Sequence, residues 1–369
     1  MALKVTWRQA LAWRLQQQFV SPTTPAAVED VVRRLIGVQA QVASSAELAV
    51  RLRRKKSEAG EVAAALADGR LVKTWAMRGT IHLLTPEEAG AALSILAAGK
   101  SWHRPSWQSY FHMTIAQMEE LRFAIRDALD GRVLTREELI AEVTRPPSHA
   151  HLGDALRSGW GTLLKPSAWQ GDLVFGPNQG TRVTFTRPES ASARWAGVPE
   201  PNEAGPALVR RYLAAYGPAT PANFGAWLSR SNRKLKAWFS PDNDVLAVDV
   251  DGHPAYVRSE DADALAAARP TDDIRLLGGF DQWVLGPGTQ DTSVLAANRR
   301  SAVSKTAGWI APIVVVGGVV KGTWELDRKV VRVAWFSEAG SVPTAGLGEE
   351  VARLAKVLGQ PLELAVESV

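Results

Sequence analysis

The stretch Ser21-Pro22-Thr23-Thr24-Pro25 separates two helical patterns near the start of the chain. Before it, residues 7–19 carry apolar side chains at four-residue spacing, which predicts one buried face of a helix. After it, we expect Thr24 to be the N-cap and Pro25 the first residue of a second helix. Gly37 lies near the end of that second helix, so the chain should break there.

Two further patterns complete this first group of elements. A third helix is expected at about residues 44–54. The extended pieces 71–76 and 80–84 bracket Met77-Arg78-Gly79, which is typical of a hairpin. The order is therefore helix, capped helix, helix and two-stranded hairpin.

The same order recurs twice further along the chain. The second group has a helical stripe at 115–129, a capping box at Thr135-Arg136-Glu137-Glu138, a third helix at about 151–164, and strands at 172–175 and 181–186. The third group has a helix at 208–216, a cap at Thr220-Pro221, a basic helix at about 231–239, and strands at 245–250 and 254–257 around Asp251-Gly252.

This order is that of a winged helix-turn-helix, so the sequence predicts an α+β protein with three tandem winged helices. We expect them at residues 1–98, 114–187 and 205–258, with connectors at 99–113 and 188–206. Residues 274–369 predict a C-terminal α+β region. Its expected strands are 276–285, 313–316, 319–326, 330–336 and 362–366, and its expected helix is 347–358.

Composition limits the possible functions. The 369 residues carry a formal net charge of +5, which favours an anionic partner. The chain has no cysteine, so disulfides, thiolate nucleophiles and Cys-ligated metals are excluded, and a cytoplasmic location is expected. We expect no membrane segment, signal peptide, cofactor or metal. His149 and His151 lack a carboxylate at metal-binding spacing, and no phosphate-binding glycine motif is present.

The motif Gln39-Ala40-Gln41 lies between the second and third helices of the first group. On a helix the two glutamines would diverge, whereas in an extended or turn segment they point the same way. Gly37 and Ser44-Ser45 favour a break in the helix here. A carboxamide is a poor general base, but it can hold a water molecule and place a dipole against developing positive charge. From spacing alone, such glutamines are more often solvated or bound to backbone groups.

Several stretches together resemble the AlkZ/YcaQ family of winged-helix DNA glycosylases, over nearly the whole chain. They are Gly37–Gln41, Trp75–Leu84, Lys165-Pro166-Ser167 running to Phe175-Gly176-Pro177, Arg211-Tyr212-Leu213 to Gly217–Pro221, and Leu276–Asp281. Each is weak alone, and the set is specific.

The resemblance implies a monofunctional, metal-free glycosylase that removes alkylated bases from double-stranded DNA. By carry-over, Gln39 and Gln41 are the catalytic residues, orienting water and stabilising the sugar cation. The Gln-apolar-Gln form is associated with self-resistance enzymes that act on bulky N7-guanine adducts and interstrand crosslinks. Because a bulky lesion cannot always enter a snug pocket, we expect a C-shaped monomer with an open, basic, concave cleft.

Candidate DNA-binding residues follow from charge and position. The basic helix places much of its positive charge on one face, which fits phosphate contact. A polar loop between residues 286 and 309, the first hairpin and the second wing offer further cations. The set is Arg78, His82, Arg182, Arg230, Arg233, Lys234, Arg299, Arg300 and Lys305. We expect His82 on the polar face of its strand, and the cluster Arg51–Lys56 to be a solvated helix terminus.

Other interpretations stay open at this stage. The architecture alone allows a non-enzymatic, DNA-binding transcriptional regulator or a protein scaffold. Asp281 is interpreted as a strand-end carboxylate that holds an arginine. A lyase would need a lysine nucleophile of lowered pKa, and the sequence singles out none.

Overall fold

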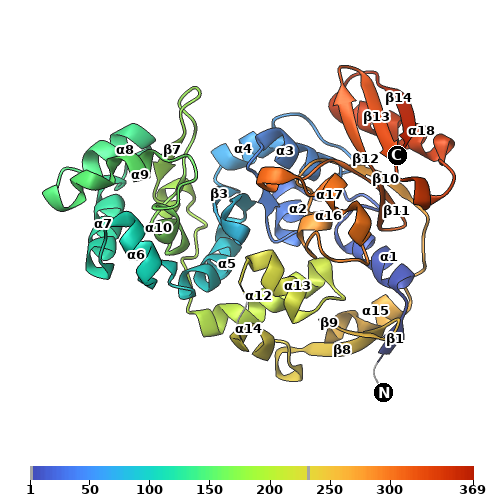
Figure 1. The fold of residues 1–369 in the computed structure, drawn as a ribbon, viewed down its shortest axis with the longest axis horizontal. Coiled ribbons are helices and arrows are strands. Elements are labelled where there is room, and N and C mark those ends of the chain that lie inside the picture. The colour runs from blue at the N-terminus through green and yellow to red at the C-terminus, as the bar shows by residue number, and fades with distance from the viewer. Residues whose placement is uncertain (1–2, 231–232) are drawn as a thin grey trace. The chain divides into compact units, whose positions relative to one another are not determined.

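A computed structural model describes residues 3–230 and 233–369 (Figure 1). The chain divides into two compact units. The first comprises Met1–Val62, Val209–Trp227 and Ser231–Val369, and the second comprises Ala63–Leu208 and Leu228–Arg230.

The first repeat begins in the first unit with three helices, α1 (Trp7–Gln17), α2 (Val28–Arg34) and α3 (Ala43–Arg51). They are followed by α4 (Glu61–Ala67), at the boundary between the units. Thr6 caps α1 through a reciprocal pair of hydrogen bonds with Gln9. The predicted N-cap at Thr24 is wrong, because α2 begins later and the strand-like Thr24 pairs instead with Arg53 and Lys55.

The second unit contains a sheet in which the strands lie in the order β4-β3-β6-β7-β5. The hairpin β3 (Val72–Trp75) and β4 (Ile81–Leu84) turns at η1 (Met77–Gly79), as predicted. The second wing, β6 (Val174–Phe175) and β7 (Thr184–Thr186), joins it through the pair Lys73 and Phe175. β5 (Leu134–Thr135) completes the sheet, so the hairpins of the first two repeats share one sheet.

The second unit also contains several helices, and some of them form within residues 99–113 and 188–206, which were expected to be connectors. The helices are α5 (Pro86–Ala98), α6 (Pro105–Phe111), α7 (Ile115–Ala128), α8 (Arg136–Val143), α9 (Gly153–Arg157), α10 (Lys165–Trp169) and α11 (Pro188–Ala191). Two 3-10 turns, η2 (Ser101–His103) and η3 (Pro147–Leu152), precede α6 and α9. The predicted capping box of α8 is confirmed by the bonds between Thr135 and Glu138.

The continuous helix expected at 151–164 is wrong. It is replaced by the end of η3, the short α9 and a turn that contains Gly161 in the left-handed region, at φ +62°. A Cβ on Gly161 would lie 2.2 Å from the indole of Trp75, so the close packing of this tryptophan requires glycine here. Tertiary packing therefore overrides the helical pattern.

The third repeat returns to the first unit. Its helices are α12 (Pro201–Tyr216), which crosses the unit boundary, α13 (Pro221–Leu228) and α14 (Arg233–Ala237). The predicted cap of α13 is confirmed, because Thr220 Oγ1 accepts from the Asn223 backbone N–H at 3.1 Å. The hairpin β8 (Val245–Val250) and β9 (His253–Arg258) is joined by β1 (Leu3–Val5), parallel to β8. A short helix, α15 (Ala262–Ala266), follows.

The C-terminal region holds a five-stranded sheet in the order β10-β11-β12-β13-β14. The strands are β10 (Ile274–Leu277), β11 (Ile313–Val316), β12 (Val319–Asp327), β13 (Val330–Trp335) and β14 (Glu363–Ser368). The helix α18 (Thr344–Leu358) connects β13 to β14, which are parallel, and packs against β10 (Figure 1). All but one of the predicted strands here are confirmed.

The exception is the strand expected at 276–285, which is only half right. β10 ends at Leu277, and the chain turns through Phe280 at φ +59° into the short helix α16 (Gln282–Leu285). Asp281 caps α16 by accepting from the Trp283 backbone N–H at 2.7 Å. A second short helix, α17 (Arg300–Val303), lies in the loop that follows.

The α+β class is therefore confirmed. The interpretation as three winged helices, with the boundaries given above, stays a prediction. Among residues 3–230 and 233–369, the helices lack the combination of length and hydropathy that a membrane crossing needs.

Candidate active site

The glutamine motif lies where the sequence places it, in a non-helical segment between two helices. β2 (Val38–Gln39) follows α2 and precedes α3. Two successive residues, Ile36 at φ +53° and Gly37 at φ +103°, adopt left-handed conformations and turn the chain out of the helix. The Gly37 N–H donates to the Val32 carbonyl at 2.9 Å and closes the helix end.

The two carboxamides differ in exposure. Gln39 has only 5% of its surface exposed, whereas Gln41 is exposed. Ala40 between them is buried at 8%. The predicted break in the helix is thus confirmed. One amide of the pair is accessible to a macromolecule, and the other is held almost entirely inside the protein.

A tyrosine from the third repeat supports the chain just before the motif. Tyr216 of α12 is fully buried, and its hydroxyl donates to the Leu35 carbonyl at 2.6 Å, at the C-terminal end of α2. A Cβ on Gly286 would lie 2.0 Å from the Tyr216 ring, so the tyrosine is tightly enclosed. No local sequence pattern marks Tyr216 as a support of the motif, because its partner is 181 residues away in the chain.

On its other side the motif leads into α3, which is fixed by a buried ion pair. Arg53, just beyond the end of α3, donates to both oxygens of Asp281 at 2.8 and 2.7 Å. The sequence-based interpretation that Asp281 holds an arginine is confirmed. The expectation that Arg51–Lys56 is a solvated terminus is wrong for Arg53, which is fully buried, and for Arg54, which pairs with Glu61.

The first hairpin carries two predicted DNA contacts, Arg78 and His82. Arg78 is partly exposed at the hairpin turn and adopts φ +57°. The expectation that His82 lies on an exposed polar face is wrong, because its side chain has no exposed surface. Burial, with the nearby charge of Arg78, lowers the pKa of His82 to about 3, so the ring is neutral. A buried neutral ring of this kind is not a phosphate contact in this conformation.

Arg182 lies on the second wing, in the loop between β6 and β7. Residues 177–182 of this loop are all exposed, and the backbones of Gln179 and Arg182 pair with each other at 3.0 and 3.1 Å. The wing is therefore an ordered, exposed turn that carries a cation at its end.

The cations before and on the basic helix have different positions. Arg230 is partly buried over the ring of Trp169, at 5.3 Å, and donates to the Leu96 carbonyl at 3.2 Å. Burial lowers the pKa of Arg230, with a smaller contribution from Arg104. Its guanidinium is thus engaged inside the second unit. The side chains of Arg233 and Lys234 lie outside the described residues.

The cations of the polar loop between residues 286 and 309 also differ in their contacts. Arg299 donates to both oxygens of Glu338 at 2.8 and 2.6 Å and lies over the Phe336 ring. This guanidinium holds the pKa of Glu338 down at about 2. By contrast, Arg300 and Lys305 are exposed and, within the described part of the chain, form no ion pair. The loop therefore offers two cations to a partner.

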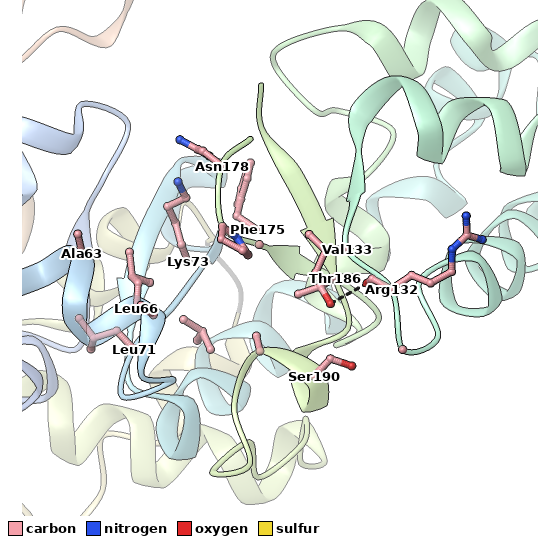
Figure 2. Close-up of a pocket in the computed structure, with 16 residues that line it drawn as sticks. Ala63, Leu66, Leu71, Lys73, Arg132, Val133, Phe175, Asn178, Thr186 and Ser190 are labelled. Carbon is pink, nitrogen blue, oxygen red and sulfur yellow. Dashed lines mark hydrogen bonds between the residues drawn. The ribbon is translucent and has the colours of Figure 1, made fainter. Parts of the chain in front are cut away.

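A cavity of about 620 Å³ lies in the second unit (Figure 2). Figure 2 shows Leu66 and Leu71 on one side of it, and Val133 and Thr186 on the other. At its edge the Lys73 ammonium lies over the Phe175 ring, at 5.2 Å, and burial lowers the pKa of Lys73. The cavity is lined by neither glutamine and by none of the predicted DNA contacts.

Across residues 3–230 and 233–369, no three His, Cys, Asp or Glu side chains lie closely enough together to hold a metal ion.

Comparison with known proteins identifies the family. The family model described as DNA glycosylase AlkZ-like matches residues 32–357. The chain belongs to the AlkZ-like DNA glycosylase family. This AlkZ-like enzyme is 48% identical, over 362 residues, to a protein of Streptomyces sahachiroi named interstrand DNA cross-link repair glycosylase, and the match covers 97% of this chain and 98% of the relative.

A solved structure agrees with this assignment. The AlkZ-like chain superimposes on Streptomyces sahachiroi DNA glycosylase AlkZ with a TM-score of 0.95 and 47% identity, covering 99% of this chain and 100% of that one. The family resemblance seen in the sequence is confirmed, and the protein is a DNA glycosylase. This membership decides against the alternative of a non-catalytic regulator.

Proposed function

We propose that this glycosylase hydrolyses the N-glycosidic bond of purines that alkylation at N7 or N3 has made cationic, including bulky adducts and interstrand crosslinks. The observation that carries the proposal is the non-helical Gln39-Ala40-Gln41 segment, in which one uncharged carboxamide, that of Gln41, is exposed and the other, that of Gln39, is nearly buried. The name of the Streptomyces sahachiroi relative, which specifies interstrand crosslink repair, supports the inclusion of crosslinks.

The chemistry needs little from the protein because the substrate is already activated. The cationic purine departs with the bonding electron pair and becomes a neutral base, which leaves an oxocarbenium-like sugar. Water adds to C1′, and its proton passes to solvent, so the products are the free base and an abasic site. Amide dipoles that stabilise positive charge on the sugar lower the barrier to this step.

We assign this role to Gln39 and Gln41 together. Each amide oxygen can accept a hydrogen bond from the attacking water or face the developing charge on the sugar. Neither can remove a proton as a strong base, so the enzyme depends on the positive charge of the leaving base. This predicts strong discrimination against undamaged purines, whose neutral bases leave poorly.

The same proposal includes DNA contacts made by the winged helices and the C-terminal region. The exposed or partly exposed cations that support it are Arg78 and Arg182 in the second unit, and Arg300 and Lys305 in the first. Arg233 and Lys234 remain candidates from the sequence, whereas Arg230 and Arg299 are assigned to internal contacts. The open basic cleft, the monomeric state and a role in repair or self-resistance stay predictions.

The proposal is tested with duplex DNA that carries N7-methylguanine at one position. We expect release of free N7-methylguanine and an abasic site that is cleaved only after alkali or heat, as for a monofunctional enzyme. An undamaged duplex of the same sequence is the control. Tight binding without release from this duplex, and from a nitrogen-mustard crosslinked duplex, would contradict the assigned reaction.

A further inference from the structure

A short exposed turn at residues 305–309 is built as a small hairpin. Ser304 pairs with Ile310, and the Lys305 N–H donates to the Trp309 carbonyl at 2.8 Å. All five residues of the turn are exposed. Ala307 adopts φ +56°, a left-handed conformation that costs free energy for a residue with a Cβ. The fold therefore maintains a defined, strained turn at the surface rather than a relaxed loop.

The turn ends in a tryptophan that is half exposed, although indole favours burial. Trp309 keeps 49% of its surface exposed, while its ring meets the Phe280 ring edge to face at a centroid distance of 5.0 Å. Phe280 itself is only 5% exposed. One part of the indole is therefore fixed by a buried residue, and the remainder faces outward.

The buried side chains that hold this turn also contact the chain next to the glutamine motif. Phe280, Val303 and Ile310 belong to one buried cluster in the first unit, and Val42, the residue after Gln41, packs against the same cluster. A Cβ on Gly279 would lie 3.0 Å from the Ile310 carbonyl oxygen and 3.7 Å from the Ser45 hydroxyl of α3. The turn and the residue that follows the glutamine motif therefore pack against the same core.

Two cations belong to the turn and to the short helix before it. Lys305 begins the turn, and Arg300 lies five residues earlier, at the start of α17, with its Nε 3.3 Å from Thr289 Oγ1. Neither forms an ion pair among the described residues. An exposed aromatic ring with neighbouring cations is the combination that proteins use to stack on a nucleobase while holding its phosphates.

We propose that Trp309 is a base-stacking residue, which packs against a base or base pair exposed next to the lesion while Lys305 and Arg300 contact the adjoining phosphates. The assignment rests on the proposed function, because it needs DNA at the glutamine motif. Side chains that stack against or wedge between bases compensate for the stacking lost when a duplex is opened. Trp309 would in this way hold the distorted duplex in position for Gln39 and Gln41.

The test compares Trp309→Ala and Trp309→Phe with the wild type on the N7-methylguanine duplex. Loss of one base-stacking contact weakens binding by roughly 5- to 150-fold. We expect Trp309→Ala to lose affinity and single-turnover release within this range, and Trp309→Phe to recover most of it. The control is Trp160→Ala, which removes another exposed indole, 70% exposed, from the second unit and leaves both values unchanged.

A second readout separates stacking from a structural role. 2-Aminopurine placed next to the lesion is quenched when it stacks on an aromatic ring, so its fluorescence on binding should be higher with Trp309→Ala than with the wild type. Wild-type affinity, release and quenching in Trp309→Ala would overturn the stacking role. If Trp309→Ala does not fold, Trp309→Phe decides the question. A complete loss of 2-aminopurine quenching in Trp309→Phe, with a normal melting temperature, would also overturn the stacking role. Absence of base release by the wild type would instead contradict the proposed function.

Discussion

Arg53 and Asp281 form a bidentate ion pair with donor–acceptor distances of 2.8 and 2.7 Å, and neither side chain has exposed surface. Arg53 also donates to the Ala49 carbonyl of α3 at 2.9 Å, and Asp281 caps α16. The pair therefore connects the helix that follows the glutamine motif to the turn that holds Phe280. The pair joins residues 228 positions apart in the chain.

Breaking this pair should destabilise the protein strongly. Removal of one partner leaves a buried, uncompensated charge, which costs about 3–5 kcal/mol. We expect Arg53→Leu and Asp281→Asn each to lower the free energy of unfolding by this amount, as measured by urea denaturation.

The exposed pair of Arg8 and Asp272 supplies the control. Its side chains are 67% and 85% exposed, and Asp272→Asn should change the free energy of unfolding by less than about 1 kcal/mol. Equal effects of Asp281→Asn and Asp272→Asn would contradict a special role for the buried pair.

Tyr216→Phe should lower both stability and activity. The change removes the hydroxyl that donates to the Leu35 carbonyl, at a cost of about 1–2 kcal/mol, and releases the end of α2 just before Gln39. Tyr212→Phe is a matched control one helical turn earlier, because its hydroxyl donates to the Gly286 carbonyl at 3.0 Å instead.

Melting curves and single-turnover base release distinguish the two variants. Both should lose similar stability, but only Tyr216→Phe should slow base release at a temperature where both are folded. Equal rates of release in the two variants would show that the support of α2 does not affect the glutamines.

His82 should make the protein sensitive to acid. Its pKa is about 3 in the folded protein, against about 6.5 when unfolded, so the unfolded chain binds the proton first as pH falls. Stability from neutral His82 is fully present above pH 6.5 and is lost progressively between pH 6.5 and 3. The loss amounts to several kcal/mol.

Urea denaturation between pH 4 and 8 measures this effect. We expect His82→Gln to flatten the loss of stability below pH 6.5, whereas His112→Gln, which alters an exposed histidine, should leave the profile unchanged. An unaltered profile in His82→Gln would assign the acid sensitivity to other groups.

Two exposed cations should contribute to DNA binding through phosphates. Because each neutralised phosphate releases counterions, Arg182→Ala and Lys305→Ala should each reduce the slope of log affinity against log salt by about 1. Arg299→Ala should leave the slope unchanged, since Glu338 already holds that guanidinium. Fluorescence anisotropy at several salt concentrations gives the slopes. Wild-type slopes in both Arg182→Ala and Lys305→Ala would contradict a contact of these two residues with DNA phosphates.

Local signals in the sequence predicted much of the fold. The capping box at Thr135, the N-cap at Thr220 and the hairpins around Arg78 and Asp251 depend on residues a few positions apart, and the structure has them. The helix break at Gly37, which precedes the glutamine motif, also follows from a local signal in the sequence.

The errors come from long-range contacts. Thr24 cannot act as a cap because its backbone pairs with Arg53 and Lys55, and the helix expected at 151–164 yields to the packing of Trp75 on Gly161. The support that Tyr216 gives to α2 and the role proposed for Trp309 were missed for the same reason. Their partners, Leu35 and Phe280, are assigned only by the tertiary structure.

The central claim is that two neutral carboxamides suffice to cleave a glycosidic bond whose base already carries a positive charge. It is tested most directly by single-turnover release of N7-methylguanine with Gln39→Ala and Gln41→Ala, alongside their affinity for the same duplex. The account predicts that each variant loses at least about 100-fold in rate, a size typical of removing one stabilising dipole, while binding the duplex nearly as tightly as the wild type. Release at the wild-type rate by a variant that combines Gln39→Ala and Gln41→Ala would contradict the claim.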